Sequence, residues 1–122
     1  MAGKVILVVD DSPTQLKLTT SFLQGKGYEI LTAVDGEDAL EKAAFYKPDL
    51  IVLDVVMPKM DGYQACRKIK ASGDTKHIPV IMLTSKDKKA DEFWGKKQGA
   101  DMYLTKPVDE AELIDAVSKS IG

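Results

Sequence analysis

The sequence has little that could fix a fold covalently or anchor it in a membrane. Cys66 is its one cysteine, which excludes an internal disulfide and is typical of a reducing compartment. The N-terminal apolar run, residues 5–9, is too short for a secretory signal or a membrane-spanning helix. We therefore expect a cytoplasmic protein that does not insert into membranes.

Strong charge of one sign is also absent, and so are repeats, linkers and low-complexity segments. Lys and Arg number 17 against 19 Asp and Glu, so the net charge of −2 gives no indication of direct nucleic-acid binding. A chain of 122 residues with 44% hydrophobic residues fits one domain with one sizeable core. We therefore expect residues 1–122 to form a single domain.

Five short apolar runs recur along the chain, each continuous rather than alternating with polar residues. Such runs are typical of strands that are buried on both faces of a parallel sheet. The runs are residues 5–9, 30–33, 50–53, 80–83 and, more weakly, 102–104.

The segments that follow these runs predict five amphipathic helices. Four begin after a capping residue: Ser12, Asp35, Asp61 and Asp109. Ser12 with Gln15 and Asp109 with Glu112 also have the spacing of a capping box. The remaining helix is expected from about residue 87 to 98. The predicted fold is therefore α/β, a (βα)5 doubly wound parallel sheet with helices on both faces.

Polar residues follow the ends of four predicted strands. Asp10 and Asp11 follow the first strand, Asp54 the third, Thr84 the fourth and Lys106 the fifth. Because ligand sites of open α/β sheets lie beyond the carboxyl ends of the strands, we expect these side chains to converge there.

Three converging carboxylates need a functional reason. Two like charges 4 Å apart cost about 4 kcal/mol at an effective dielectric constant near 20. A divalent cation removes that cost, and oxygen ligands suit Mg²⁺, with Mn²⁺ as an alternative. Lys106 suits a phosphoryl oxygen, and Asp54, on the strand expected at the centre of the sheet, is the best-placed nucleophile.

Seven segments, in this order and at this spacing, resemble the response-regulator receiver domains of bacterial two-component systems over essentially the whole chain. They are residues 8–12, 35–36, 48–54, 57–62, 79–84, 99–100 and 103–107. The resemblance implies a flavodoxin-like sheet of strand order 2-1-3-4-5 and a receiver without an output domain. Residues 93–100 and 103–109 further resemble stand-alone receivers of type IV pilus (twitching-motility) and chemotaxis-like pathways.

The resemblance also implies roles for the residues at the strand ends. Asp54 would accept a phosphoryl group from a histidine kinase or a phosphotransfer protein. Lys106 and Thr84 would bind phosphoryl oxygens, and the Lys106–Pro107 peptide would be cis. The Mg²⁺ ligands would be Asp10, Asp11, Asp54 and the backbone carbonyl of Val56.

A conformational switch is implied as well. Tyr103 would turn inward as Thr84 moves toward the phosphoryl group, and the face of helix four, strand five and helix five would then bind a target protein. The protein would be a monomer or a phosphorylation-dependent dimer. Val56 and Lys86 would tune the attack of water, and because Val56 cannot orient water we expect slow self-dephosphorylation.

Two other functions compete with this switch. An aspartyl-phosphate hydrolase of the haloacid-dehalogenase type needs a second acid where this chain has Val56, and usually a cap for which 122 residues leave no room. A phosphorylation-independent pseudo-receiver would lack an acid, the hydroxyl or the lysine, all of which are present. Outside the site, Cys66 is expected in the core, His77 in a loop, and Phe93 and Trp94 in helix packing.

Overall fold

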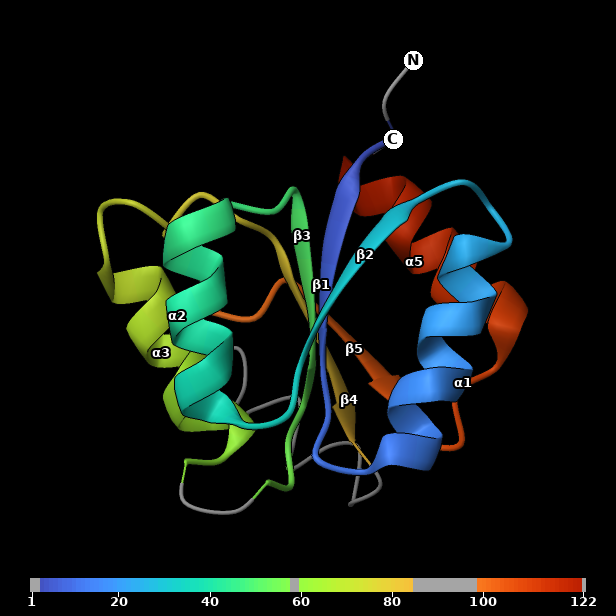
Figure 1. Ribbon diagram of the computed structural model, residues 1–122, viewed down its shortest axis with the longest axis horizontal. Coiled ribbons are helices and arrows are strands. Elements are labelled where there is room, and N and C mark those ends of the chain that lie inside the picture. The colour runs from blue at the N-terminus through green and yellow to red at the C-terminus, as the bar shows by residue number, and fades with distance from the viewer. Residues whose placement is uncertain (1–2, 58–59, 85–98, 122) are drawn as a thin grey trace.

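The computed structural model describes residues 3–57, 60–84 and 99–121. Its centre is a five-stranded parallel sheet in the order β2-β1-β3-β4-β5 (Figure 1). The strands are β1 (Val5–Val9), β2 (Glu29–Ala33), β3 (Leu50–Asp54), β4 (Val80–Thr84) and β5 (Met102–Thr105). The predicted fold class and strand order are confirmed, and β3 is the central strand.

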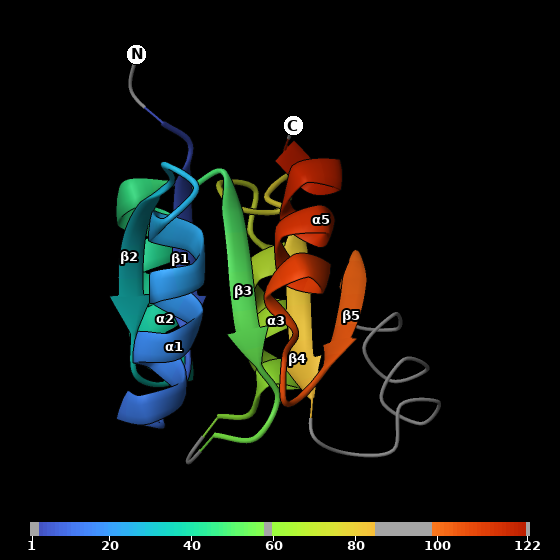
Figure 2. The ribbon, with the colours of Figure 1, turned by 90° about the vertical axis from the view of Figure 1, so that its right-hand side faces the viewer.

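Four described helices cover the two faces of the sheet. They are α1 (Pro13–Gln24), α2 (Gly36–Tyr46), α3 (Gly62–Ala71) and α5 (Glu110–Ile121). Helices α1 and α5 cover one face, and α2 and α3 cover the other (Figures 1 and 2). The helix expected from about residue 87 to 98 lies outside the described residues. No described helix is long and apolar enough to cross a membrane.

Successive side chains along each strand point to opposite faces of the sheet, which divides the core into two parts. On β1, Ile6 and Val8 point toward α1 and α5, whereas Leu7 and Val9 point toward α2 and α3. The inner strands β1, β3 and β4 are almost completely buried, as predicted. That prediction is wrong for β2 and β5, whose residues are mostly half-exposed, because an edge strand has a neighbouring strand on one side only.

The capping residues begin the helices where predicted, and the Asp109 carboxylate accepts a hydrogen bond from the Glu112 backbone N–H at 3.0 Å. The capping box expected at Ser12 and Gln15 is incomplete. The Ser12 hydroxyl accepts a hydrogen bond from the Gln15 backbone N–H at 3.4 Å. The Ser12 backbone N–H donates instead to Asp10 Oδ1, at 2.9 Å, because the Asp10 carboxylate lies only two residues before it and can bend back to the backbone. A complete capping box, which the sequence analysis missed, joins Asp61 and Gln64 at the start of α3.

Candidate functional site

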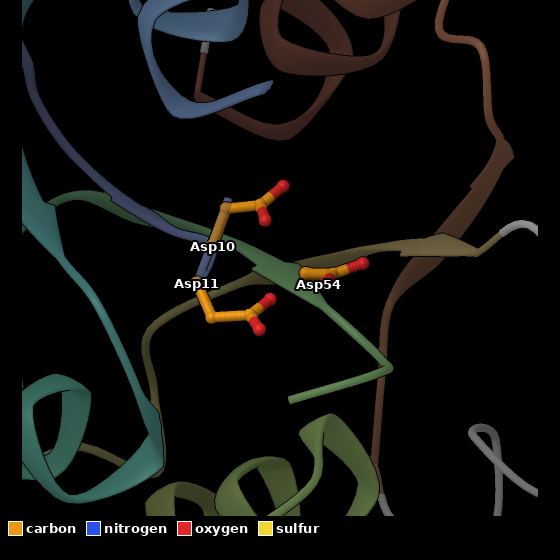
Figure 3. Close-up of side chains that lie close together, drawn as sticks. All are labelled: Asp10, Asp11 and Asp54. Carbon is orange, nitrogen blue, oxygen red and sulfur yellow. The ribbon is translucent and has the colours of Figure 1, made fainter. Parts of the chain in front are cut away.

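Three carboxylates meet at the carboxyl edge of the sheet. Asp10 and Asp11 follow β1, and Asp54 ends the neighbouring strand β3, where Val9 and Leu53 are register partners. One carboxylate oxygen from each acid lies within 4.8 Å of those of the other two (Figure 3). The predicted convergence of the acids is therefore confirmed.

Lys106 joins this cluster from the segment after β5. Its Nζ donates to Asp54 Oδ1 at 2.9 Å and to Asp10 Oδ2 at 3.0 Å. Its backbone N–H donates to the Thr84 carbonyl at 2.7 Å, which fixes the segment beside the end of β4. The Lys106–Pro107 peptide is cis, as the resemblance implied. One ammonium group thus contacts two of the three carboxylates.

Burial sets the electrostatics of these groups. Asp10 is 2% exposed and Asp54 is 5% exposed, whereas Asp11 is exposed. Burial raises the pKa of Asp54 and repulsion from Asp10 and Asp11 adds to this, while the hydrogen bond from Lys106 opposes it. Burial alone would lower the pKa of Lys106, but its bonds to Asp54 and Asp10 outweigh that effect and raise it. The site therefore retains a protonated lysine and an excess of negative charge.

The donor set fits a hard divalent cation. Each of the three acids offers carboxylate oxygen, and neither histidine nor cysteine takes part. Both oxygens of Asp10 already accept hydrogen bonds, from Ser12 and from Lys106, so this carboxylate is held in place. Asp11 is open to solvent beside it. Mg²⁺ requires oxygen ligands and excess negative charge, and this cluster offers both.

The remaining predicted site residues lie at the same edge or beside it. Thr84 is fully buried at the end of β4, opposite Thr105. Val56 follows Asp54 by two positions, and its side chain is 51% exposed. Tyr103 is half-buried on β5 and packs against the core under α2 and α3. Lys86 lies outside the described residues.

Residues outside the site behave largely as predicted. Cys66 is buried in the core, and burial raises the pKa of its thiol to about 12, so it stays a neutral packing group. His77 is exposed in the loop before β4. Phe93 and Trp94 lie outside the described residues.

Helix α3 approaches the acid site more closely than the sequence predicted. The Gly62 backbone N–H donates to the Val55 carbonyl at 2.8 Å. A Cβ atom at Gly62 would lie 2.4 Å from the carbonyl oxygen of Asp54, so only glycine fits. The available signal was the glycine directly after the Asp61 cap, because glycine is the residue used where the backbone must come close to another group.

Comparisons with known proteins agree with this geometry. The family model of the response regulator receiver domain matches residues 6–118. Protein PilH of Pseudomonas aeruginosa PAO1 is 45% identical over 113 residues, which cover 93% of each chain. Protein PilG of the same strain is 42% identical over 119 residues, covering 98% of this chain and 88% of PilG.

A solved structure is similar over nearly the whole chain. It is the receiver domain of the sensor histidine kinase PA1611 from P. aeruginosa PAO1, described with a magnesium ion coordinated in its active-site cleft. It has a TM-score of 0.92 and 33% sequence identity, covering 99% of both chains. With the matched family model and the two relatives, this shows that the chain belongs to the response regulator receiver domain family.

Proposed function

We propose that this receiver domain is a phosphorylation switch whose phosphoacceptor is Asp54. The observation that carries the proposal is Lys106, whose Nζ lies 2.9 Å from Asp54 and 3.0 Å from Asp10 within a cluster of three carboxylates. A structural salt bridge would pair one cation with one acid. An ammonium shared by two acids, with a third acid beside them, suits a site that neutralises an incoming phosphoryl group.

The covalent step uses the Asp54 carboxylate as nucleophile. One of its oxygens attacks phosphorus, an O–P bond forms, and the N–P bond to the phosphohistidine of the kinase or phosphotransfer protein breaks. The electron pair of that bond leaves with the imidazole. Burial raises the pKa of Asp54, and the more basic carboxylate is the better nucleophile.

The neighbouring residues position this step. The Ser12 backbone N–H and Lys106 hold the two oxygens of Asp10, and Lys106 is placed to contact a phosphoryl oxygen. Asp10, Asp11, Asp54 and the Val56 carbonyl would hold Mg²⁺, or Mn²⁺ as an alternative. When bound, the cation neutralises carboxylate and phosphoryl oxygens together.

The output is a change of surface rather than turnover of a substrate. In this proposal Thr84 moves toward the phosphoryl group and Tyr103 turns inward, which changes the predicted face of helix four, β5 and α5; helix four is the helix expected over residues 87–98, outside the described residues. A target protein then binds that face, to a monomer or to a phosphorylation-dependent dimer. The similarity to PilH and PilG supports the type IV pilus subgroup. We place the exchange in the cytoplasm, without nucleic-acid or membrane contact.

Incubation with Mg²⁺ and acetyl phosphate, followed by intact-protein mass spectrometry, tests the proposal. We expect the wild type to gain the mass of one phosphoryl group and Asp54→Asn to gain none. Asp74→Asn, which removes an exposed acid from the loop after α3, is the control and should gain the group. Continuous phosphate release would instead indicate a hydrolase, and no mass gain would indicate a pseudo-receiver.

The aspartyl phosphate should be long-lived. The Val56 side chain is half-exposed where a polar residue could bind an attacking water, but it has no hydrogen-bonding group. We expect Val56→Gln to shorten the phosphoryl half-life, measured by loss of the mass gain after removal of the donor. A half-life of seconds in the wild type with Mg²⁺ would contradict this prediction.

A further inference from the structure

Two side chains of α2 hold the end of β2 on the side that faces away from β1. In the described sheet β2 is an edge strand, with β1 as its only neighbouring strand. Lys42 Nζ donates a hydrogen bond to the Thr32 carbonyl. Asp38 Oδ2 accepts a hydrogen bond from the Val34 backbone N–H at 3.1 Å and lies 3.4 Å from Lys42 Nζ. Helix α2 therefore contacts backbone groups on both sides of Ala33.

The other side of the same strand end holds a residue of the acid site. The Ala33 carbonyl accepts a hydrogen bond from the Asp10 backbone N–H at 3.1 Å. Ala33 is fully buried, and its register partner is Val9, the residue before Asp10. Successive residues of a strand direct their backbone groups to opposite sides, so the Thr32 carbonyl points away from β1. The end of β2 thus lies between α2 on one side and Asp10 on the other.

The pair of Asp38 and Lys42 occupies the place of a missing strand. An edge strand presents unpaired N–H and carbonyl groups on its outer side, and here two of these groups are bound by side chains instead of by a further strand. Helix α2 is itself fixed at its start, because Asp35 accepts a hydrogen bond from the Asp38 backbone N–H at 2.8 Å. The pair therefore ties the strand end to a capped helix.

We propose that Asp38 and Lys42 are positioning residues of the cation site and act on Asp10 through the end of β2. This inference rests on the proposed function, which assigns Asp10 to the cation. The pair fixes the residues on either side of Ala33, and the Ala33 carbonyl then fixes the backbone of Asp10. A shift of that backbone moves the Asp10 carboxylate relative to the other two acids.

The sign of the effect at Lys42 separates positioning from simple electrostatics. If charge alone mattered, loss of the Lys42 charge would strengthen Mg²⁺ binding, because like charges repel. Lys42→Met keeps a long side chain but removes the donor to the Thr32 carbonyl. We expect it to weaken Mg²⁺ binding by roughly tenfold, the lower end of the loss when a group that orients metal ligands is changed.

Isothermal titration calorimetry without a phosphodonor measures this affinity. Lys119→Met is the matched control, because it also breaks a pair of i, i+4 spacing, the exposed pair of Asp115 and Lys119. Lys119 lies in the last turn of α5, and this end of α5 lies at the edge of the sheet opposite to the carboxyl ends of the strands (Figure 2). The control should bind Mg²⁺ like the wild type.

Two variants of Asp38 remove the same charge and differ in hydrogen bonding. Asp38→Asn keeps an oxygen that can accept from the Val34 backbone N–H, whereas Asp38→Ala does not. A purely electrostatic effect would weaken Mg²⁺ binding equally in both. We expect Asp38→Ala to bind Mg²⁺ several-fold more weakly than Asp38→Asn, and this comparison decides the matter if Lys42→Met does not fold.

Amide hydrogen exchange in the metal-free protein tests the positioning directly. We expect Lys42→Met to speed the exchange of the Asp10 backbone N–H, while the backbone N–H of Val52, in the central strand β3, exchanges as in the wild type. A purely structural role would instead speed exchange at both residues and leave the Mg²⁺ affinity of the folded protein intact.

The failure of this inference is distinguishable from the failure of the proposed function. Mg²⁺ binding by folded Lys42→Met that equals or exceeds that of the wild type overturns the inference, and so do equal affinities of Asp38→Ala and Asp38→Asn. Lack of Mg²⁺ binding by the wild-type protein would instead overturn the proposed function.

Discussion

Asp54 is a carboxylate in surroundings that disfavour its charge. It is 5% exposed, and both Asp10 and Asp11 raise its pKa by repulsion in addition to the effect of burial. Lys106 compensates only partly, because it is shared with Asp10. In the metal-free protein, ionised Asp54 therefore lowers the stability of the fold.

This arrangement predicts how stability depends on pH. Because the folded-state pKa of Asp54 is raised, the protonated carboxyl group of Asp54 favours the folded protein. This contribution to stability is fully present below the unfolded-state pKa of Asp54 and is lost as the pH rises through its folded-state pKa. We therefore expect Asp54→Asn to be more stable than the wild type at neutral pH in chelator. The difference should shrink as the pH falls.

Urea unfolding of both proteins over the range from acid to neutral pH measures this difference. Asp74→Asn should show no comparable change, because its carboxylate is exposed and takes no part in the acid cluster. A wild type that gains stability over Asp54→Asn as the pH rises would contradict the prediction.

Among the described elements, β3 and α3 approach each other closely beside the site. The first residue of α3 is Gly62, and its Cα lies against the backbone of Asp54 and Val55. The Asp61–Gln64 capping box fixes the helix start at that place. The helix therefore cannot move toward the sheet, and a side chain at its first position would push it away.

Gly62→Ala should destabilise the fold by about 1–3 kcal/mol, the usual cost of overpacking. The added Cβ would lie 2.4 Å from the Asp54 carbonyl oxygen and 2.8 Å from the Val55 Cα, which are backbone atoms that cannot rotate away. Gly25→Ala is the control, because its Cβ would meet only ordinary contacts at 3.5 Å and beyond. Urea unfolding of both variants measures the cost, and equal stabilities would refute this account.

For the whole molecule, cation binding and folding are linked. The three acids come from the ends of two strands and meet only when the sheet is formed, so a cation binds the folded chain in preference to the unfolded one. Ligand binding of this kind stabilises the folded protein by mass action.

Mg²⁺ at one hundred times its dissociation constant should therefore raise the free energy of unfolding by about 2.7 kcal/mol. We expect Asp11→Asn to lose most of this increment and to be more stable than the wild type without metal, because it removes repulsion. Thermal or urea unfolding with Mg²⁺ and with chelator measures both effects. Asp74→Asn should keep the full increment, and a wild type that Mg²⁺ does not stabilise would contradict the linkage.

Local patterns were enough to predict the strands and the acids at their ends. The apolar run before Asp54 indicated a buried strand. The fold class then placed that strand at the centre of the sheet, with its carboxyl end beside Asp10. The convergence of the acids followed, because the carboxyl ends of parallel strands share one edge of the sheet. The half-exposure of β2 and β5 was not predicted, since a short apolar run does not show whether a strand has one neighbour or two.

The tertiary structure alone decided the contacts that tune the site. Lys106 and Asp10 are 96 residues apart in sequence, and the sharing of Lys106 between Asp10 and Asp54 depends on how the segment after β5 meets β1 and β3. The close approach of Gly62 to the backbone of Asp54 and Val55 likewise depends on how α3 packs against the end of β3. Sequence periodicity reports which face of an element is buried, but distances between elements are set by the packing of all their side chains together.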